Sequence, residues 1–170
     1  MQELWEPVEP EDPDFAALLL TSHLKVVGVP LAAEHLTEDL PPRELARWLY
    51  RDAPFVLLAH RLTADPTFCY ANLAGQRCFG YSWAEFSGLP SRYSAAAPDR
   101  AERDRLFEQV DAHGYIDDYR GLRIAKSGAQ FWIERATVWN LVDGAGRLHG
   151  QAAAFTPPDP PPSPAPTDSP

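Results

Sequence analysis

Cysteine, methionine and long apolar runs are all scarce in this sequence. Its 170 residues contain only two cysteines and one methionine. The two cysteines, Cys69 and Cys78, are too far apart for a Cys-x-x-Cys motif and too few for a disulfide framework. No apolar stretch approaches the ~20 residues that a membrane-spanning helix needs, and the acidic start lacks the basic and apolar regions of a signal peptide. We therefore expect a cytoplasmic protein with two buried thiols.

Positive charge is also in short supply. Lys and Arg together number 15 against 24 Asp and Glu, which gives a formal net charge of −9. This balance argues against a nucleic-acid backbone or an anionic membrane surface as partner, because both require a basic face. It equally suits a small domain that stays soluble through its net charge. The sequence also lacks a Gly-x-Ser-x-Gly nucleophile motif and a Gly-rich phosphate loop.

Composition and helix signals divide the chain into four segments. Residues 1–11 are predicted to be a flexible acidic lead, and the proline-rich residues 157–170 a disordered tail. Between them, residues 12–53 form an N-terminal helical extension and residues 54–156 the core. Helices are predicted over 12–27 and over 43–52. The first begins with Asp12 as the cap, and Pro13 fits the first turn because a backbone N–H at that position would have no partner within the helix.

Strands and short helices in the core do not alternate. Two strands, over 55–62 and 68–71, precede short helices over 72–79 and 83–87 and a longer helix over 100–113. The last two helices begin at potential capping boxes, Ser82–Glu85 and Asp99–Glu102. Three strands joined by tight turns follow, over 115–125, 130–142 and 147–155. This order predicts an α+β domain with a five-stranded antiparallel sheet.

The last three strands are apolar on both faces. Simple alternation along 130–142 places one group on one side and a second group on the other: Phe131, Ile133, Thr137, Trp139 and Leu141 against Trp132, Ala136, Val138 and Val142. An antiparallel sheet with one wet face would alternate apolar and polar residues instead. We therefore expect the short helices to cover one face, and the N-terminal helices or a second subunit to cover the other.

The turn near Ser127 and Gly128 allows two pairings of the strands that flank it. A two-residue turn would set Arg120 opposite Arg135, which brings like charges together. A register slipped by one residue sets Arg120 opposite Glu134 and Leu122 opposite Trp132. We expect the slipped register, because the turn type fixes the pairing.

Several motifs in order resemble a known family. Residues 70–88, with Asn72-x-Ala74 and Gly80-Tyr81, resemble the PAS pattern. The match is closer to the MEKHLA family, whose pattern is similar to residues 65–72, 90–92, 114–121, 136–140 and 150–153. The resemblance spans roughly residues 15–156. It implies a PAS-like fold, with the short-helix cluster on one face of the sheet and the N-terminal helices covering the other.

The resemblance also implies a regulatory role. Related domains end plant homeodomain–leucine-zipper transcription factors, where they resemble regulatory interaction modules. This sequence contains no homeodomain or zipper, so the plant role does not transfer directly. The resemblance implies neither a particular ligand nor a particular protein partner, and it leaves the cofactor unknown.

Known PAS cofactors find no clear ligands in the sequence. Blue-light sensors place a photoadduct cysteine in a segment similar to Gly88–Tyr93, where this chain has Ser91, so a thiol adduct to flavin cannot form there. Non-covalent flavin binding stays open. Haem needs an axial ligand such as histidine, but the five histidines are scattered, and neither they nor the cysteines form a zinc cluster.

A PAS-like pocket would lie on the helix-facing side of the sheet. The predicted lining residues are Asn72, Arg92, Tyr119, Asn140 and Gln151, with Trp139 positioned to stack on a planar ligand. Each polar candidate has a structural alternative, because buried polar groups are normally satisfied by the protein itself. Asn72 could cap a helix, Arg92 could pair with a carboxylate, and Gln151 could bond to the backbone.

The sequence is compatible with three functions. The first is a non-catalytic sensory or protein-interaction module that holds a small apolar or planar molecule, and that forms a homodimer through the leading helices or the sheet. The second is a small enzyme that uses Asp118 or Glu134 as acid or base. The third is a purely structural interaction domain with a filled core.

Overall fold

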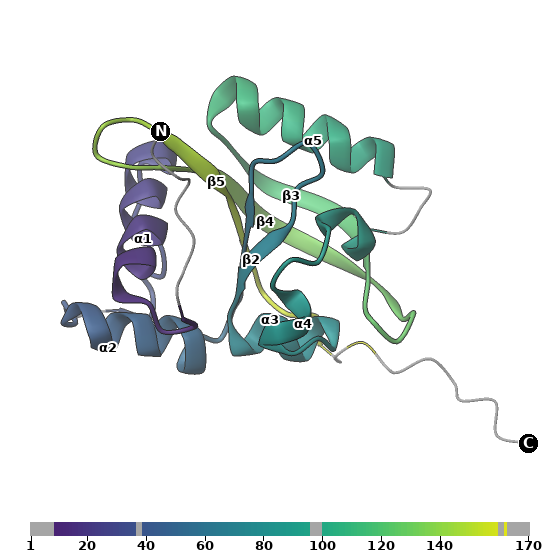
Figure 1. The fold of residues 1–170 in the computed structure, drawn as a ribbon, viewed down its shortest axis with the longest axis horizontal. Helices are drawn as coiled ribbons and strands as arrows, with labels where there is room; N and C mark the ends of the chain where they lie inside the picture. The colour runs from purple at the N-terminus through teal and green to yellow at the C-terminus, as the bar shows by residue number, and fades with distance from the viewer. Residues whose placement is uncertain (1–8, 37–38, 96–99, 160–161, 163–170) are drawn as a thin grey trace, which may run out of the picture.

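The computed structural model describes residues 9–36, 39–95, 100–159 and 162 (Figure 1). Its centre is a five-stranded antiparallel sheet with strand order β2-β1-β5-β4-β3. The strands are β1 (Val56–Arg61), β2 (Phe68–Ala71), β3 (Tyr115–Ile124), β4 (Gln130–Val142) and β5 (Leu148–Phe155). The predicted α+β class and antiparallel sheet are confirmed. Residues 1–8 of the acidic lead and most of the proline-rich tail lie outside the described residues, as does Asp99 of the second predicted capping box.

Two helices precede the sheet and pack on one of its faces, here called the outer face (Figure 1). Helix α1 (Pro13–Val27) begins at Asp12, whose carboxylate accepts the backbone N–H groups of Asp14 and Phe15, and it ends at Gly28. Helix α2 (Pro42–Arg47) continues into a π-helical turn, η1 (Trp48–Asp52). Both predicted N-terminal helices are therefore present.

The core beneath α1 is apolar. It joins side chains of α1, α2, η1 and the outer face: Phe15, Leu18, Leu19, Ala46, Leu49, Leu57, Ala59, Cys69, Tyr70, Trp139, Leu141 and Ala152. Ser22, fully buried in α1, donates its hydroxyl to the carbonyl of Val142 and accepts the N–H of the same residue, both at 2.9 Å. This pair of hydrogen bonds to the backbone of β4 fixes α1 against the sheet.

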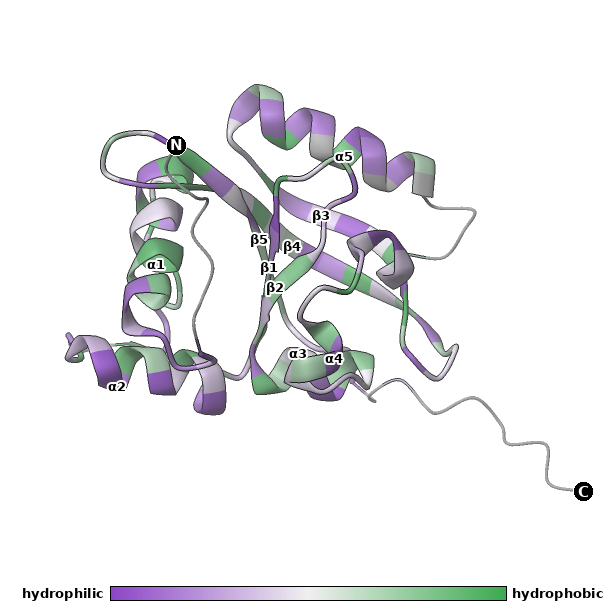
Figure 2. Ribbon diagram, in the orientation of Figure 1, coloured by the Kyte–Doolittle hydropathy of each residue, from purple (hydrophilic) through white to green (hydrophobic). Residues whose placement is uncertain are grey.

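The opposite, inner face carries the remaining helices. They are α3 (Leu73–Phe79), α4 (Trp83–Phe86), the 3-10 helix η2 (Ser91–Ser94) and α5 (Arg100–His113). Helix α4 begins with the predicted capping box, in which Ser82 and Glu85 each accept the other's backbone N–H. Helix α5 is hydrophilic over most of its length (Figure 2) and turns Leu106 and Val110 inward. A second apolar core lies between these helices and the sheet.

The predicted register of β3 and β4 is confirmed. Leu122 pairs with Trp132, and Arg120 lies 3.1 Å from Glu134 in a salt bridge. The prediction missed two bulges that flank the Tyr119–Ala136 pair, one on each strand. Asp118 and Arg135 occupy these bulges with φ of 53° each, a backbone conformation that L-residues rarely adopt.

The bulge at Arg135 makes the predicted faces of β4 wrong. One extra residue reverses the alternation, so Phe131 and Ile133 share the inner face with Ala136 and Val138, not with Trp139 and Leu141. Unbroken alternation is correct only on one side of such a bulge. A bulge leaves no mark in the hydrophobic pattern when both faces are apolar.

Trp132 is consequently not covered. It lies on the outer face beyond the reach of α1 and α2, is 45% exposed, and packs beneath the guanidinium of Arg120 at 3.8 Å. The expectation that Trp132 and Val138 share a buried face is wrong, because Val138 faces inward and is 5% exposed. The N-terminal helices thus cover only part of the outer face.

None of the helices in the described segments combines the length and the apolarity needed to cross a lipid bilayer.

A close backbone approach joins β1 to β5 at Gly150. A Cβ atom added there would lie 2.3 Å from the carbonyl oxygen of His60. We expect Gly150→Ala to lower the free energy of unfolding by about 1–3 kcal/mol, because the strands must separate to accept it. Gly144→Ala is the matched control, since its Cβ would meet no atom within 4 Å. Urea denaturation of both variants measures the difference, and equal midpoints would contradict the prediction.

Candidate functional site

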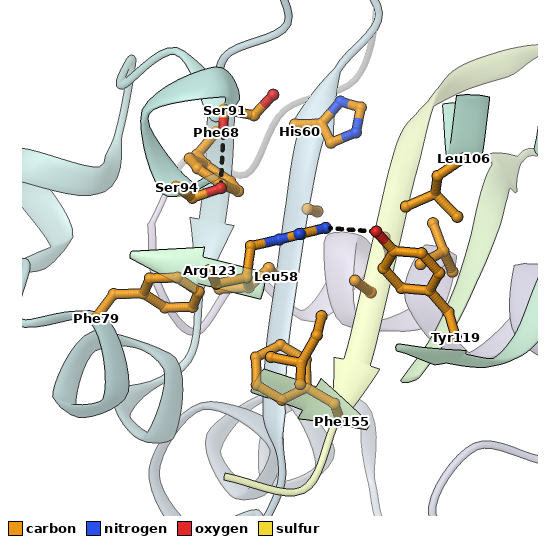
Figure 3. A pocket seen from close by; sticks show the side chains of 15 residues that line it. Leu58, His60, Phe68, Phe79, Ser91, Ser94, Leu106, Tyr119, Arg123 and Phe155 are labelled. Carbon is orange, nitrogen blue, oxygen red and sulfur yellow. Dashed lines mark hydrogen bonds between the residues drawn. The ribbon is translucent and has the colours of Figure 1, made fainter. Parts of the chain in front are cut away.

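The inner core contains a cavity of about 60 Å³ between the sheet and the helices (Figure 3). All five strands contribute residues to its floor, and α3, η2 and α5 contribute its walls. The lining is Leu58, Ala59, His60, Phe68, Phe79, Ser91, Ser94, Leu106, Tyr119, Arg123, Ile133, Val138, Ala152, Ala153 and Phe155. Apolar side chains dominate, and the few polar groups are therefore conspicuous.

A guanidinium crosses this apolar space. Arg123 is 8% exposed, and Figure 3 shows it extending toward Tyr119 on the same strand. It donates to the carbonyl of Leu122 at 2.9 Å and to the phenol oxygen of Tyr119 at 3.4 Å, and its charge lies 5.5 Å from the Tyr119 ring centre. No carboxylate in the described part of the chain forms a salt bridge with it.

Gly121 makes this arrangement possible. Tyr119, Gly121 and Arg123 alternate along β3 and so share its inner face. A Cβ at Gly121 would lie 2.6 Å from the Tyr119 hydroxyl and 2.9 Å from a terminal nitrogen of Arg123. The missing side chain therefore leaves the space in which the phenol and the guanidinium meet.

Three further polar residues stand near one end of the cavity (Figure 3). His60 comes from β1, and its Nδ1 lies 3.1 Å from the carbonyl oxygen of Arg61. Ser91 and Ser94 come from η2, where the Ser94 hydroxyl donates to the carbonyl of Ser91 at 2.7 Å. The opposite end is formed by the rings of Phe79 and Phe155. The cavity is thus polar toward η2 and apolar toward α3.

Of the six residues predicted from the sequence, Tyr119 lines this cavity. Asn72 does not: it is fully buried at the start of α3 and fills all four of its hydrogen-bonding positions with backbone groups. Its amide donates to the carbonyls of Leu49 and Phe55, and its oxygen accepts the N–H groups of Leu57 and Gly75. The alternative interpretation, a helix cap, describes its position.

Arg92 and Trp139 also lie away from the cavity. Arg92 pairs with both carboxylate oxygens of Asp65 at 3.1 and 3.2 Å and packs over Tyr93. Trp139 faces α1 across the outer face, where its ring meets His23 edge-on at 4.8 Å. The Arg135 bulge explains why Trp139 does not point to the helix-facing side.

Asn140 and Gln151 lie together on the inner face, beneath α5. They pair across β4 and β5, and the Gln151 amide donates to Asn140 at 3.1 Å and to Asp111 at 3.2 Å. The Asn140 amide donates to the carbonyl of Val110 at 3.3 Å. These bonds attach the last turns of α5 to the sheet, and neither side chain lines the cavity.

The carboxylates considered for acid–base chemistry are outside the cavity as well. Asp118 is exposed at the bulge in β3. Glu134 is exposed on the outer face, where it pairs with Arg120.

Both thiols are buried away from the cavity, Cys69 in the outer core and Cys78 in the inner core. Burial raises the pKa of the Cys78 thiol to about 12. Because the thiolate is the reactive form, we expect Cys78 to react with Ellman's reagent only after unfolding in guanidinium. The absorbance at 412 nm measures the reaction of the thiols, and labelling of Cys78 in the native protein at pH 8 would contradict the prediction. Ser91, which the sequence resemblance places in the segment of the photoadduct cysteine, does line the cavity.

Metal-binding geometry is not seen among the described residues, which contain no cluster of three or more His, Cys, Asp or Glu side chains placed to hold an ion. The histidines are dispersed: His23 packs against Trp139, and His149 bonds to Asp143 at 2.8 Å in the β4–β5 turn.

Sequence reasoning missed Arg123, the most unusual residue of the site. A signal was available, because alternation along 115–125 places Arg123 on the same face as Tyr119 and Gly121. A charged residue on a strand face that must pack against helices is a candidate for function. The scatter of the five histidines gives no reason to select His60, and Ser91 stands out in the sequence only because blue-light sensors carry a cysteine in the similar segment.

Comparison with solved structures shows the same fold. A PAS domain from Colwellia psychrerythraea superposes with a TM-score of 0.58 at 15% identity, covering 66% of this chain and 92% of that one. An RNA-binding light-oxygen-voltage receptor gives 0.59 at 23% identity, and a blue-light-activated histidine kinase from Erythrobacter litoralis gives 0.54 at 18%. The receptor match covers 74% of this chain and the kinase match covers 64%. This chain in turn spans only about a third of each protein, 36% of the receptor and 34% of the kinase.

Comparison with curated proteins found no match. A family model, by contrast, covers nearly all of the described chain: the MEKHLA domain matches residues 13–157. This span includes the two N-terminal helices, the whole sheet and every residue that lines the cavity. The sheet order and the helices on its inner face agree with the PAS-like fold of the solved structures. The chain is therefore a member of the MEKHLA domain family, with a PAS-like fold.

Proposed function

We propose that this chain is a non-catalytic regulatory module that binds a small molecule in the cavity between its sheet and its inner helices. The observation that carries the proposal is the convergence of Arg123, Tyr119 and His60, with two serines of η2, on a largely apolar space. A core that served packing alone would gain stability from apolar residues at these positions. Ligand pockets combine an apolar lining with a few polar groups in the same way.

The solved relatives support a sensory role at the level of the fold. One is a light-oxygen-voltage receptor and another a blue-light-activated kinase. Ser91 in place of the adduct cysteine separates this chain from thiol-adduct photochemistry. The signal is therefore proposed to be the ligand itself.

The size of the cavity favours a second candidate, an interaction domain that works without a ligand. Small-molecule sites usually enclose roughly 300–1,000 Å³, whereas this cavity holds about 60 Å³. A ligand of ordinary size would require η2 or α5 to move outward. The two candidates differ in whether the purified protein carries, or takes up, a bound molecule.

Native mass spectrometry distinguishes them. A regulatory ligand module is expected to show a mass above that of the 18.9 kDa chain, which reverts to the chain mass on denaturation. An absorbance spectrum between 350 and 450 nm of the same sample identifies flavin or haem. If the native mass spectrum shows only the chain after purification, and no ligand is taken up from a metabolite library, the interaction domain is favoured.

The exposed part of the outer face supports a homodimer. Trp132 and Leu122 lie side by side there, and Arg120 and Glu134 flank them with opposite charges. In a twofold arrangement the arginine of one copy could pair with the glutamate of the other while the tryptophans become covered. Sedimentation velocity at a series of concentrations tests this, and Trp132→Ala is expected to shift the protein toward monomer. A wild-type chain that stays monomeric at all concentrations would disprove it.

A further inference from the structure

We propose that the ligand of this cavity is a small carboxylic acid, held as its anion by the guanidinium of Arg123. The inference rests on the proposed function, since it assumes that the cavity binds a ligand. It adds the chemical class, which neither the fold nor the family assigns.

A buried guanidinium needs a counter-charge. Removing a charge from water costs several kcal/mol, and proteins normally offset this cost by pairing it with an opposite charge. Arg123 is more than nine-tenths buried, yet in the described part of the chain it meets only a backbone carbonyl and a phenol oxygen. The bond to Tyr119, at 3.4 Å, is also long for an N–H donor. Among the described residues, the site therefore has a positive charge without a matching anion.

The geometry favours a carboxylate over a point acceptor. A guanidinium carries five N–H donors in a planar fork, and two of them are used here. Carboxylates accept two parallel N–H bonds from such a fork, which makes them better partners than single oxygens. The Tyr119 hydroxyl beside the fork can turn its proton to a carboxylate oxygen while its oxygen remains near Arg123. Gly121 keeps the space between the two side chains open.

The other lining residues determine the chemical character of the part of the ligand beyond its carboxylate. Beyond the guanidinium the wall is formed by Leu58, Phe79 and Phe155, all apolar. Phe68 and Ile133 add further apolar surface. An anion with a short aliphatic or aromatic body matches this arrangement, with its carboxylate at Arg123 and its body against the phenylalanines. A highly charged or strongly polar molecule would leave groups without hydrogen-bond partners.

The test uses matched pairs of acids and neutral amides. Acetate, butyrate and benzoate are compared with acetamide, butyramide and benzamide, which have nearly the same shape but no charge. Titration of the ¹⁵N-labelled full chain by NMR at pH 7 gives both the affinity and the location. We expect at least one acid to bind ~10-fold or more tightly than its amide, a difference of one decade in Kd. The shifted amide signals should include Gly121 and Arg123.

Two variants assign the preference to Arg123. Arg123→Gln removes the charge and is expected to reduce the preference for acid over amide to less than ~2-fold, because the carboxylate then loses its ion pair. Arg47→Gln removes an exposed arginine from α2, on the opposite face of the sheet, and should leave the preference unchanged. Thermal melts confirm that both variants fold, and the comparison of acid with amide on the wild-type chain does not depend on them.

The outcomes separate the inference from the proposed function. If acid and amide bind equally, or if Arg123→Gln keeps the full preference, the carboxylate inference is wrong while a ligand-binding module remains. If no probe binds, the inference is also wrong. Should native mass spectrometry then show no ligand either, the proposed function fails with it.

Discussion

Replacing Asn72 with alanine is expected to lower the free energy of unfolding by about 3 kcal/mol or more. Asn72 is fully buried and joins three segments of backbone: η1, the start of β1 and the first turn of α3. Alanine would leave two carbonyls and two N–H groups without partners, and each buried unsatisfied group costs about 1–3 kcal/mol. Urea denaturation followed by circular dichroism measures the loss.

An aspartate at the same position tests the reason. Asp is as good a helix cap as Asn, so Asn72→Asp would be nearly neutral if capping α3 were the whole role. The structure predicts a large loss for this variant too, because aspartate cannot donate to the carbonyls of Leu49 and Phe55. It would also place a negative charge beside those two oxygens. A stable Asn72→Asp variant would show that the two donated bonds contribute little.

Replacing Trp139 with alanine is expected to cost about 3–5 kcal/mol, the range for removing a large aromatic side chain from a core. Trp139 is completely buried at the centre of the outer core, between β4 and α1. It packs edge-on against His23, whose pKa is lowered by burial, so that the imidazole is neutral near pH 7. The cavity left by alanine would separate α1 from the sheet. The midpoint of urea denaturation measures the loss.

Trp132→Ala is the matched control on the same strand. Trp132 is 45% exposed, and the guanidinium of Arg120 stacks on its ring. Loss of an exposed cation–π contact is worth about 0.5–1 kcal/mol. Both variants are measured at a protein concentration where the wild-type chain is monomeric, so that any dimer contact of Trp132 does not contribute. Equal losses for the two tryptophans would contradict the assignment of Trp139 to the core and Trp132 to the surface.

Local chemistry made most elements predictable. The cap at Asp12, the capping box at Ser82 and the turns that close each hairpin depend on residues close together in sequence. The register of β3 and β4 followed from avoiding a clash between Arg120 and Arg135, and the Arg120–Glu134 salt bridge confirms it. Each of these conclusions rested on interactions between near neighbours in the sequence or across one turn.

The site was much less predictable. Asn72, Arg92, Asn140 and Gln151 were sound choices by residue type, but the structure gives each of them protein partners. Arg123 was not among the predicted lining residues, although it is buried in the cavity. Its direction depends on the bulges around Tyr119, which decide the faces of both strands.

The sequence alone determined the order of the elements, the antiparallel pairing and the membership of the family, because caps, turns and motifs act over short distances. Only the tertiary structure decided which side chains share a face, what the N-terminal helices cover and where a charge lies buried. These properties depend on two single-residue bulges and on packing between segments far apart in the chain. In a sheet with two apolar faces, the hydrophobic pattern of the sequence reveals neither the bulges nor this packing.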